Sequence, residues 1–276
     1  MGIFISFVLA VGYFLGASQG NGYLGLGFAA ILSAVMTLGS YYQGDKMALW
    51  SAGAVRIKKE DNPYVWRMVE NLSITAGLPM PAVHIIPSNA LNAFATGRDP
   101  QHASIAVTIG LINTLENEEL EGVLAHELSH VQNYDIRIMT IVLVLVGIVG
   151  ILSDFFTHRL FWSSRDDREN MNPFFMIAGI ILAILSPIIA MLIQLAISRK
   201  REFLADASAA LLTRYPDGLA SALRKISGSD IPLETANSST AHLFISNPFG
   251  KKFSISSLFS THPPIEERIK ELEKML

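Results

Sequence analysis

The chain begins with a long apolar stretch, and this pattern predicts a start embedded in a membrane. No Asp, Glu, Lys or Arg occurs from Gly2 to Gly44. About 20 apolar residues suffice to cross a hydrocarbon core as a helix, so the stretch is long enough for two crossings. The polar, glycine-rich break at residues 18–22 favours a tight turn. We predict a transmembrane hairpin over residues 1–44, with helices near 3–17 and 24–42. A cleaved signal peptide is the alternative for the first half, but no Lys or Arg precedes the apolar run.

Residues 45–136 have the pattern of a water-soluble domain, because charged residues return and apolar positions follow helical or alternating spacing. The cap sequence Asp61-Asn62-Pro63 predicts the start of a helix that ends at Gly77. Asn117 is expected to cap a later helix. Three short runs bounded by Gly and Pro predict the strands of a small sheet, near 83–86, 93–95 and 104–109.

A second apolar pair, near 138–156 and 174–197, predicts another transmembrane hairpin over residues 137–198. The first member of the pair is short, with an uncharged core of only about 16 residues between Arg137 and Asp154. A full crossing therefore requires these two charged side chains to lie at opposite interfaces.

The last part of the chain, residues 199–276, is polar again and ends in a predicted helix from Pro263 to Leu276. We expect it to complete the soluble domain that residues 45–136 begin. The predicted fold class is an α-rich membrane protein, with four transmembrane helices and an α+β catalytic domain that contains a small sheet.

Composition agrees with a membrane location and narrows the chemistry. Of 276 residues, 50% are hydrophobic and 16% are charged, against about a quarter charged in a soluble domain, and the mean hydropathy is +0.38. A formal charge of −3 provides no basic field, so no nucleic-acid partner is expected. The absence of cysteine excludes disulfides, thiol nucleophiles and cysteine-based zinc sites. Any metal must be held by His, Asp or Glu.

The clearest chemical signal is the sequence His126-Glu127-Leu128-Ser129-His130, which lies on a predicted helix. Two histidines four residues apart share one helix face, so both imidazoles can reach one zinc ion at about 2.0–2.1 Å. Glu127 lies beside them, where it can take a proton from a zinc-bound water and pass it to a leaving amine. The pattern indicates metal-assisted peptide hydrolysis. The alternative is a pair of hydrogen-bonded histidines on an ordinary buried helix.

A catalytic zinc needs a third protein ligand, and the best candidate is Glu202. The extended pattern with a nearby third histidine fails, because Asn133 and Ile136 stand where Gly and His are required. Glu202 and Asp206 share a face if their segment is helical, so one can bind zinc while the other accepts a hydrogen bond from a ligand histidine. Taken alone, such a pair is usually a solvated helix face.

Membrane topology supports this choice of ligand. His130 and Glu202 lie on the same membrane face only if an even number of crossings separates them. Segments 138–156 and 174–197 must therefore both span or both stay out, since a single crossing would leave about 30 Å of hydrocarbon between the ligands. Under the positive-inside rule, the basic residues on the site face place it in the cytoplasm, namely those at 46, 56, 58, 59 and 199–201.

These residues together resemble the HtpX-like zinc metallopeptidases of family M48. The resemblance rests on residues 126–130, on Glu202 through Asp206 and on the apolar hairpin between them, and it covers essentially the whole chain. It extends to Asn92-Ala93-Phe94-Ala95-Thr96-Gly97 and to His262-Pro263-Pro264 with Arg268. It implies a membrane-embedded endopeptidase of the gluzincin type, with one Zn²⁺ per subunit held by His126, His130 and Glu202, and with Glu127 as the catalytic residue.

The same resemblance implies partners and a location. Polypeptide substrates are expected, in particular misfolded membrane proteins in quality control and stress response. The expected location is the cell (inner) membrane, multi-pass in the lipid bilayer, with the catalytic domain in the cytoplasm. Asn92, Asp206, His262 and Arg268 are expected near the site, where they support ligands or substrate. Alternatively, His262 belongs to a helix start, and Arg268 is a solvated residue that pairs with Glu267 or Glu271.

One prediction concerns substrate binding, and it does not decide between two strands. The strand near 92–97 or that near 104–109 could offer a free edge onto which an extended substrate adds, or could be plain scaffold.

Three other protein classes remain as alternatives. A non-catalytic scaffold with structural zinc would have no use for Glu127 beside an open coordination position. An intramembrane protease would place its ligands in the bilayer, whereas Asn117 and the glutamates after it tie this helix to water. The CAAX prenyl endopeptidases, processing proteases of the same broad family, share the zinc motif but carry more transmembrane helices than this chain can house.

Overall fold

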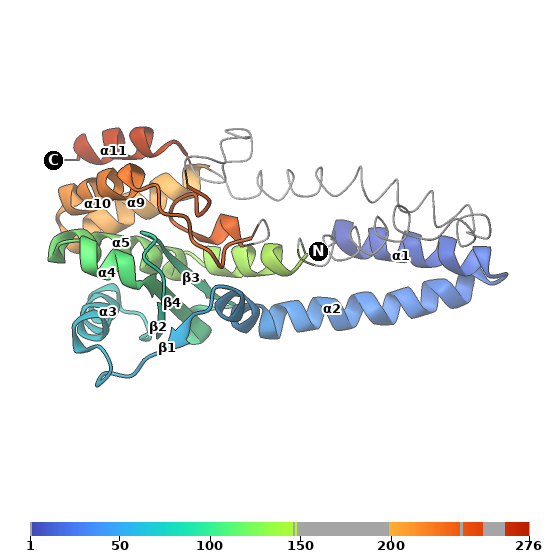
Figure 1. Cartoon of the computed structure of the whole chain (residues 1–276). Coiled ribbons are helices and arrows are strands. Elements are labelled where there is room, and N and C mark those ends of the chain that lie inside the picture. The colour runs from blue at the N-terminus through green and yellow to red at the C-terminus, as the bar shows by residue number, and fades with distance from the viewer. Residues whose placement is uncertain (1, 146, 148–198, 238–239, 251–262, 276) are drawn as a thin grey trace. The chain divides into compact units, whose positions relative to one another are not determined.

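The computed structural model describes residues 2–145, 147, 199–237, 240–250 and 263–275 (Figure 1). Its contacts divide the chain into two compact units. The first, the hairpin unit, comprises residues 1–43 and 144–193, and the second, the site unit, comprises residues 44–143 and 194–276. The predicted apolar segment 174–197 and the candidate residue His262 lie outside the described residues.

In the hairpin unit, two helices meet at the turn that the sequence predicts. Helix α1 spans Gly2–Ser18 and helix α2 begins at Gly22 and continues to Ser51, so the break at residues 18–22 is confirmed. The helices approach closely through glycine. A Cβ atom added at Gly25 would lie 2.1 Å from the carbonyl oxygen of Gly12. Small residues at the contact allow such close backbone packing between membrane helices.

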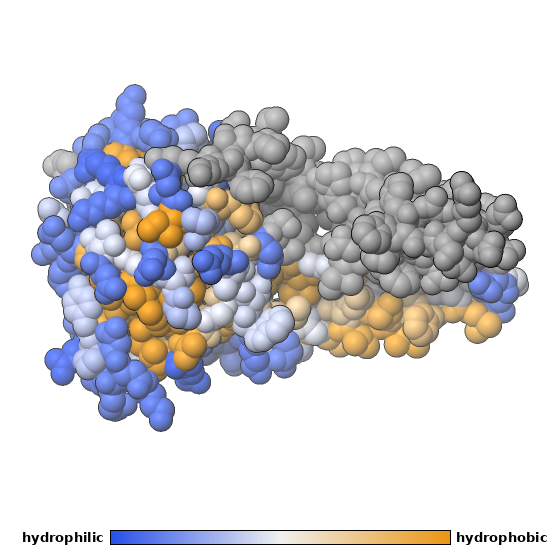
Figure 2. Space-filling view, in the orientation of Figure 1, coloured by the Kyte–Doolittle hydropathy of each residue, from blue (hydrophilic) through white to orange (hydrophobic). Residues whose placement is uncertain are grey.

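Helix α2 is the one helix among the described residues that is long and apolar enough to cross a membrane. Its large apolar side chains stay exposed, as lipid contact requires, with Tyr23 80% and Phe28 71% exposed, and apolar residues gather along it in Figure 2. Helix α1, with 17 residues, is at the lower limit of the length needed for a full crossing. Four transmembrane helices are therefore not confirmed, since most of the second apolar pair lies outside the described residues.

The site unit contains the predicted small sheet, and the sheet has one strand more than the sequence indicates. Strands β2 and β4 are parallel, while β1 pairs antiparallel with β2 and β3 pairs antiparallel with β4, giving the order β1-β2-β4-β3. Strand β1 has only two residues, too few to produce a periodic pattern. The four strands are β1 (Val55–Arg56), β2 (Ala82–Ile86), β3 (Ala93–Gly97) and β4 (Ala103–Thr108). Strand β3 is thus at an edge of the sheet, and the alternative edge at 104–109 is wrong because β4 is paired on both sides.

Helices surround this sheet and carry the candidate site residues (Figure 1). Helix α5 makes its most extensive contacts with α9 and α10, two helices from the far end of the sequence. A further helical segment covers residues 135–145. The helices of the site unit are α3 (Pro63–Ala76), α4 (Ile109–Thr114), α5 (Asn117–Gln132), α9 (Arg199–Thr213), α10 (Pro216–Gly228) and α11 (Ile265–Glu273), with short 3₁₀ turns at Pro100–His102 and Ala241–Leu243.

The cap predictions have mixed outcomes. The Asn62 side chain accepts a hydrogen bond from the Val65 amide at 3.1 Å, so the predicted start of α3 is confirmed. Helix α5 instead begins one residue earlier than expected, with Glu116 rather than Asn117 at the N-cap, and the Glu116 amide donates to Glu119 Oε2 at 2.8 Å. A glutamate at this third helical position completes a capping box, which the sequence interpretation overlooked.

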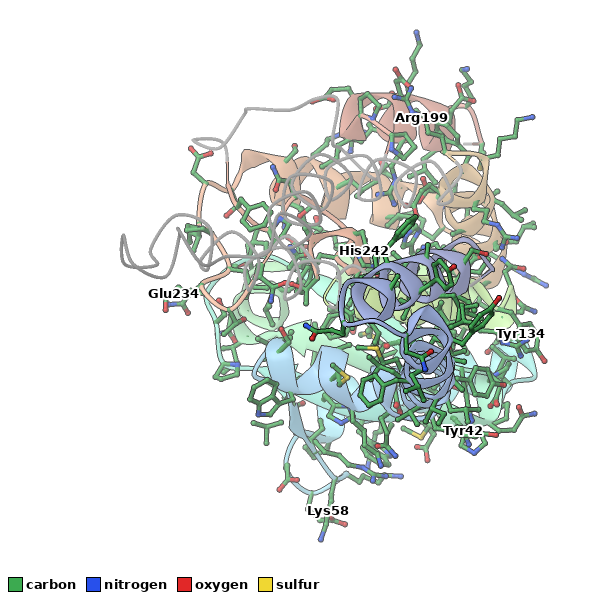
Figure 3. The ribbon with its side chains drawn as sticks, turned by 90° about the vertical axis from the view of Figure 1, so that its right-hand side faces the viewer. Tyr42, Lys58, Tyr134, Arg199, Glu234 and His242 are labelled. Atoms are coloured by element: carbon green, nitrogen blue, oxygen red, sulfur yellow. The ribbon has the colours of Figure 1, made fainter. Side chains whose placement is uncertain are left out.

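Helix α5 forms the centre of the hydrophobic core. Its stripe residues Leu120, Val123 and Leu124 are all fully buried. At Gly122 a Cβ atom would lie 2.7 Å from the Leu219 amide nitrogen, so only glycine lets α10 pack this closely. Lys58 and Glu234 project from the surface in Figure 3, whereas His242 is buried and its Nε2 lies 3.0 Å from the Met139 carbonyl oxygen.

Candidate metal centre

The two histidines predicted as ligands lie side by side on helix α5. Their positions differ by four residues, so one helical turn brings them to the same face. The Nε2 atoms of His126 and His130 lie 3.1 Å apart, and both side chains are buried. Two buried imidazole nitrogens at this separation can bind the same metal ion.

Glu202 on α9 meets these histidines although about 70 residues separate it from them in the sequence. Its Oε1 lies 3.6 Å from His130 Nε2, and its Oε2 lies 3.8 Å from His126 Nε2. Ligand atoms bound tetrahedrally at about 2.0–2.1 Å from one zinc ion lie about 3.4 Å from each other. The observed separations of 3.1, 3.6 and 3.8 Å, the last two to different oxygens of Glu202, are close to that spacing, and one ligand atom from each residue lies within 4.8 Å of the others, so this donor set is compatible with one zinc ion.

Asp206 supports His126 from one turn further along α9. Its Oδ1 lies 2.9 Å from His126 Nδ1, the nitrogen that faces away from the cluster. Arg268 on α11 holds the same carboxylate with two hydrogen bonds, of 2.8 Å from Nε and 2.7 Å from Nη2. Arg268 is completely buried, so its interpretation as a solvated residue paired with Glu267 or Glu271 is wrong. A carboxylate on the second nitrogen fixes the tautomer and orientation of a ligand histidine.

Asp135 supports His130 in the same way, and sequence reasoning missed it. Its Oδ2 lies 3.0 Å from His130 Nδ1, and its Oδ1 pairs with Arg201. Helix α5 ends before this residue, and Tyr134 has a positive φ of 59° that turns the chain back toward the histidine. A left-handed tyrosine has no sequence signature, so spacing alone gave no signal for Asp135.

Glu127 points into the same buried site, and its carboxyl group hydrogen-bonds the backbone of Ala95 on β3. Burial, together with the charge of Glu202, raises the pKa of Glu127 to about 7. A carboxyl group with that pKa can both accept and return a proton near neutral pH.

The surroundings of the two histidines shift their pKa values in opposite directions. Burial, and next to it the charge of Arg268, lowers the pKa of His126 to about 4, which keeps this imidazole neutral. Burial alone would lower the pKa of His130, but Asp135 and the nearby glutamates raise it to about 9. Burial would raise the pKa of Asp206, yet Arg268 holds it at about 2. A cation in this cluster would balance the excess of carboxylates around the histidines.

Asn92 immediately precedes β3 and contacts a distant segment. Its Nδ2 donates to the Ser246 carbonyl oxygen at 3.1 Å, and its Oδ1 accepts from the Ser246 amide at 3.4 Å. His262, the remaining candidate, lies outside the described residues.

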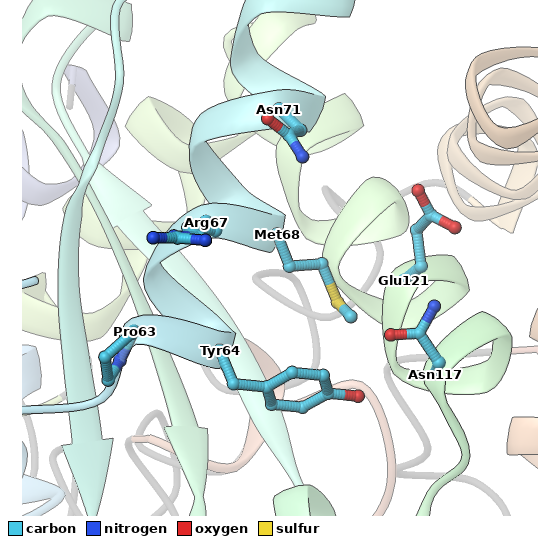
Figure 4. A pocket seen from close by; sticks show the side chains of 7 residues that line it. All are labelled: Pro63, Tyr64, Arg67, Met68, Asn71, Asn117 and Glu121. Atoms are coloured by element: carbon cyan, nitrogen blue, oxygen red, sulfur yellow. The ribbon is translucent and has the colours of Figure 1, made fainter.

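A separate pocket of about 480 Å³ lies between α3 and α5 and contains none of the cluster residues (Figure 4). Tyr64 and Met68 face Asn117 and Glu121 across it. Burial, together with the charges of Glu118 and Glu121, raises the pKa of the Tyr64 phenol. The sequence interpretation gave this region no function.

Two histidines and a glutamate that converge on one point, with a second glutamate beside them, define the class of metallopeptidases with a His₂Glu ligand set. Comparison with known proteins makes the assignment specific. The model of peptidase family M48 matches residues 59–276. The chain belongs to this family and is a membrane metalloprotease.

Relatives match almost the whole chain. It is 50% identical over 276 residues to a "Protease HtpX homolog" of Tropheryma whipplei (strain Twist), covering 99% of this chain and 94% of that protein. A protein of the same name from Caldanaerobacter subterraneus subsp. tengcongensis is 45% identical over 278 residues, covering 99% and 92%. A third, from Listeria monocytogenes serotype 4a, is 44% identical over 288 residues, covering 100% and 94%.

A solved structure shows a similar fold. The crystal structure of S. mikatae Ste24p superimposes with a TM-score of 0.52 at 18% sequence identity. The match covers 99% of this chain and 62% of the Ste24p chain, so this chain spans less than two thirds of that protein.

Proposed function

We propose that the protein is a zinc-dependent endopeptidase in which His126, His130 and Glu202 bind one Zn²⁺ and Glu127 is the catalytic residue. The single observation that carries this proposal is the meeting of Glu202 with the two α5 histidines at ligand spacing, from a distant part of the chain. The carboxylates of Asp135 and Asp206 on the outer histidine nitrogens support it, because metal-binding histidines are oriented in this way.

The chain's own residues provide the proton transfers of peptide hydrolysis. Bound zinc supplies Lewis acidity that polarises the scissile carbonyl and makes water more acidic. Glu127 takes the proton from the attacking water and delivers it to the leaving amine, and its raised pKa suits both steps. Asp206 and Asp135 keep the two imidazole rings in place throughout.

Activity and metal content test this proposal separately. We expect the purified protein to cleave casein, a chelator to abolish cleavage, and added zinc to restore it. Glu127→Gln should retain zinc and lose cleavage, because only the proton acceptor is removed. Glu202→Ala should lose zinc itself. Full cleavage by Glu127→Gln would disprove the base assignment, and stoichiometric zinc in Glu202→Ala would disprove the ligand assignment.

For the organisation of the chain, we propose four membrane crossings, with transmembrane hairpins at residues 1–44 and 137–198 and a catalytic domain built from 45–136 and 199–276. The even number of crossings that a shared zinc requires supports this division. The proposed location is the cell membrane with the site in the cytoplasm, where misfolded membrane proteins would be substrates in quality control. A non-catalytic scaffold fits less well, since it has no use for Glu127.

Single cysteines can test this topology, because the natural chain contains none. Lys58→Cys, on the exposed surface of the site unit, should react with a membrane-impermeant maleimide only after the cells are opened. Gln19→Cys, in the turn between α1 and α2, should react in intact cells. The reverse pattern would refute the cytoplasmic orientation.

A further inference from the structure

Strand β3 is at the edge of the sheet. The backbone amide and carbonyl groups of every second residue in it point away from β4. Asn92 faces β4, because its carbonyl oxygen accepts a hydrogen bond from the Thr108 amide at 3.1 Å and its amide donates to Thr108 Oγ1 at 3.1 Å. Along a strand of an antiparallel pair, successive residues point these backbone groups alternately toward the partner strand and away from it. The outward-facing main chain, here called the β3 edge, therefore belongs to Ala93, Ala95 and Gly97.

The end of the β3 edge at Ala93 is closed by a segment of this chain. The Ile245 amide donates to the Ala93 carbonyl oxygen at 3.0 Å, and the Ala93 amide donates to Asn92 Oδ1 at 3.1 Å. The neighbouring Ser246 is held through its amide and its carbonyl oxygen by the Asn92 side chain. Ile245 is buried in the core, so the segment that closes this end of the β3 edge is held in place.

The end at Gly97 is closed by Thr140, which lies in the helical segment 135–145. Its hydroxyl oxygen accepts a hydrogen bond from the Gly97 amide at 3.2 Å and also lies 3.2 Å from the Gly97 carbonyl oxygen, to which it donates. Thr140 is 2% exposed. One step beyond, Arg137 Nε donates to the Arg98 carbonyl oxygen at 2.7 Å. The helical segment thus occupies the main-chain groups on this side.

Ala95 lies between these two closures. Its backbone amide is the group that hydrogen-bonds Glu127, which places it opposite the catalytic carboxyl group. Its carbonyl oxygen has no hydrogen-bond partner within the residues that the structure describes. An extended chain that enters the site next to Glu127 therefore meets one available main-chain acceptor on the β3 edge.

We propose that Asn92 and Thr140 are specificity-determining residues that limit main-chain pairing between substrate and protease to a single hydrogen bond at Ala95. This rests on the proposed peptidase function. Addition of a full strand to a sheet edge binds a substrate through several main-chain bonds, whereas here the flanking positions are filled by the protease itself. The substrate class is then any polypeptide with a very short extended stretch, rather than one that offers a long strand.

An N-methyl scan of a peptide substrate tests the limit, because methylation removes one backbone donor at a time. The probe is a synthetic peptide that spans one bond of β-casein cut by the wild-type protease. We expect one sensitive nitrogen at or next to the cleaved bond, with kcat/KM reduced about tenfold or more. The informative positions are the nitrogens two residues to either side, which a longer strand would pair with Ala93 and Gly97. Methylation there should change kcat/KM by less than about threefold, as expected where no hydrogen bond is lost.

Two variants at Thr140 that differ by one oxygen atom provide the matched control. Thr140→Ser keeps the hydroxyl on Gly97 and should reproduce the wild-type pattern. Thr140→Ala frees both Gly97 groups while alanine maintains the helix. For a substrate antiparallel to β3, a second sensitive nitrogen should then appear two residues toward the substrate N-terminus. Zinc content and thermal unfolding of both variants show whether the fold is intact.

The outcomes separate this proposal from the proposed function. Several sensitive nitrogens spaced two residues apart in the wild type would overturn the single-bond limit alone, since cleavage itself would have been observed. An identical pattern in Thr140→Ala and Thr140→Ser would overturn the boundary assigned to Thr140. A wild-type protein that cleaves neither casein nor the unmethylated peptide would overturn the peptidase function, and this proposal with it.

Discussion

Loss of the buried Arg268 guanidinium should destabilise the site unit strongly. The side chain is completely buried, makes two hydrogen bonds to Asp206 at 2.7 and 2.8 Å, and donates a third to the Ile245 carbonyl oxygen at 3.3 Å. Arg268→Met preserves most of the volume but leaves the Asp206 carboxylate buried without its cation. Breaking a buried ion pair in this way costs about 3–5 kcal/mol. In a unit of this size each kcal/mol lowers the melting temperature by about 2–4 °C, so a decrease of about 6–20 °C is expected.

The measurement is thermal unfolding of the detergent-solubilised protein by intrinsic fluorescence, with and without a chelator. Lys274→Met removes an exposed cation at the C-cap of the same helix and is the matched control, for which almost no shift is expected. Arg268→Lys retains the charge but not the two-pronged geometry and should fall between the two. A decrease for Arg268→Met no larger than that for Lys274→Met would refute the idea that this ion pair supports the fold.

Three further changes test separate parts of the structure. Asp135→Asn should weaken zinc binding about 10- to 100-fold, because it loosens the orientation of a ligand histidine, and competition with a chromogenic chelator measures this. Burial alone would raise the pKa of Glu119, but hydrogen bonds from Lys225 and Ser221 hold it below its usual value, so its contribution to stability is present above the unfolded pKa and disappears as the pH falls through the folded one. Glu119→Gln should therefore lower the melting temperature at pH 7, and the difference should shrink as the pH falls below the ordinary pKa of a glutamate; an effect that is the same at every pH would contradict this account. Gly122→Ala should cost about 1–3 kcal/mol because its Cβ meets the α10 backbone, whereas Gly228→Ala, which meets nothing within 4 Å, should be neutral or stabilising.

The sequence indicated the residues that converge in the candidate metal centre, because the proximity of the two histidines depends on local helical spacing. His126 and His130 share a face on any helix, and Glu202 followed from the need for a third ligand on the same side of the membrane. The interior position of β4 and the edge position of β3 depended on strand order, which hydrophobic alternation does not encode.

Residues whose role depends on a tertiary contact were harder to predict. Asp135 reaches His130 only through the left-handed turn at Tyr134, and Arg268 is buried only because Asp206 lies where α11 packs. In the sequence, neither side chain differs from an ordinary solvent-exposed charged residue. A charged side chain can be buried when an oppositely charged partner is buried beside it, and here that partner comes from a different part of the chain.

The distance along the chain between the two halves of the metal cluster has a consequence for biosynthesis. On the proposed ligand set, the segment from residue 131 to residue 201 must leave the ribosome before Glu202 can join the histidines. A nascent chain that has folded α5 and the sheet holds two imidazoles but lacks the carboxylate that completes the donor set. On the proposed ligand set, an unfinished chain is thus unable to cleave itself or the insertion machinery around it until the intervening apolar segments have been made.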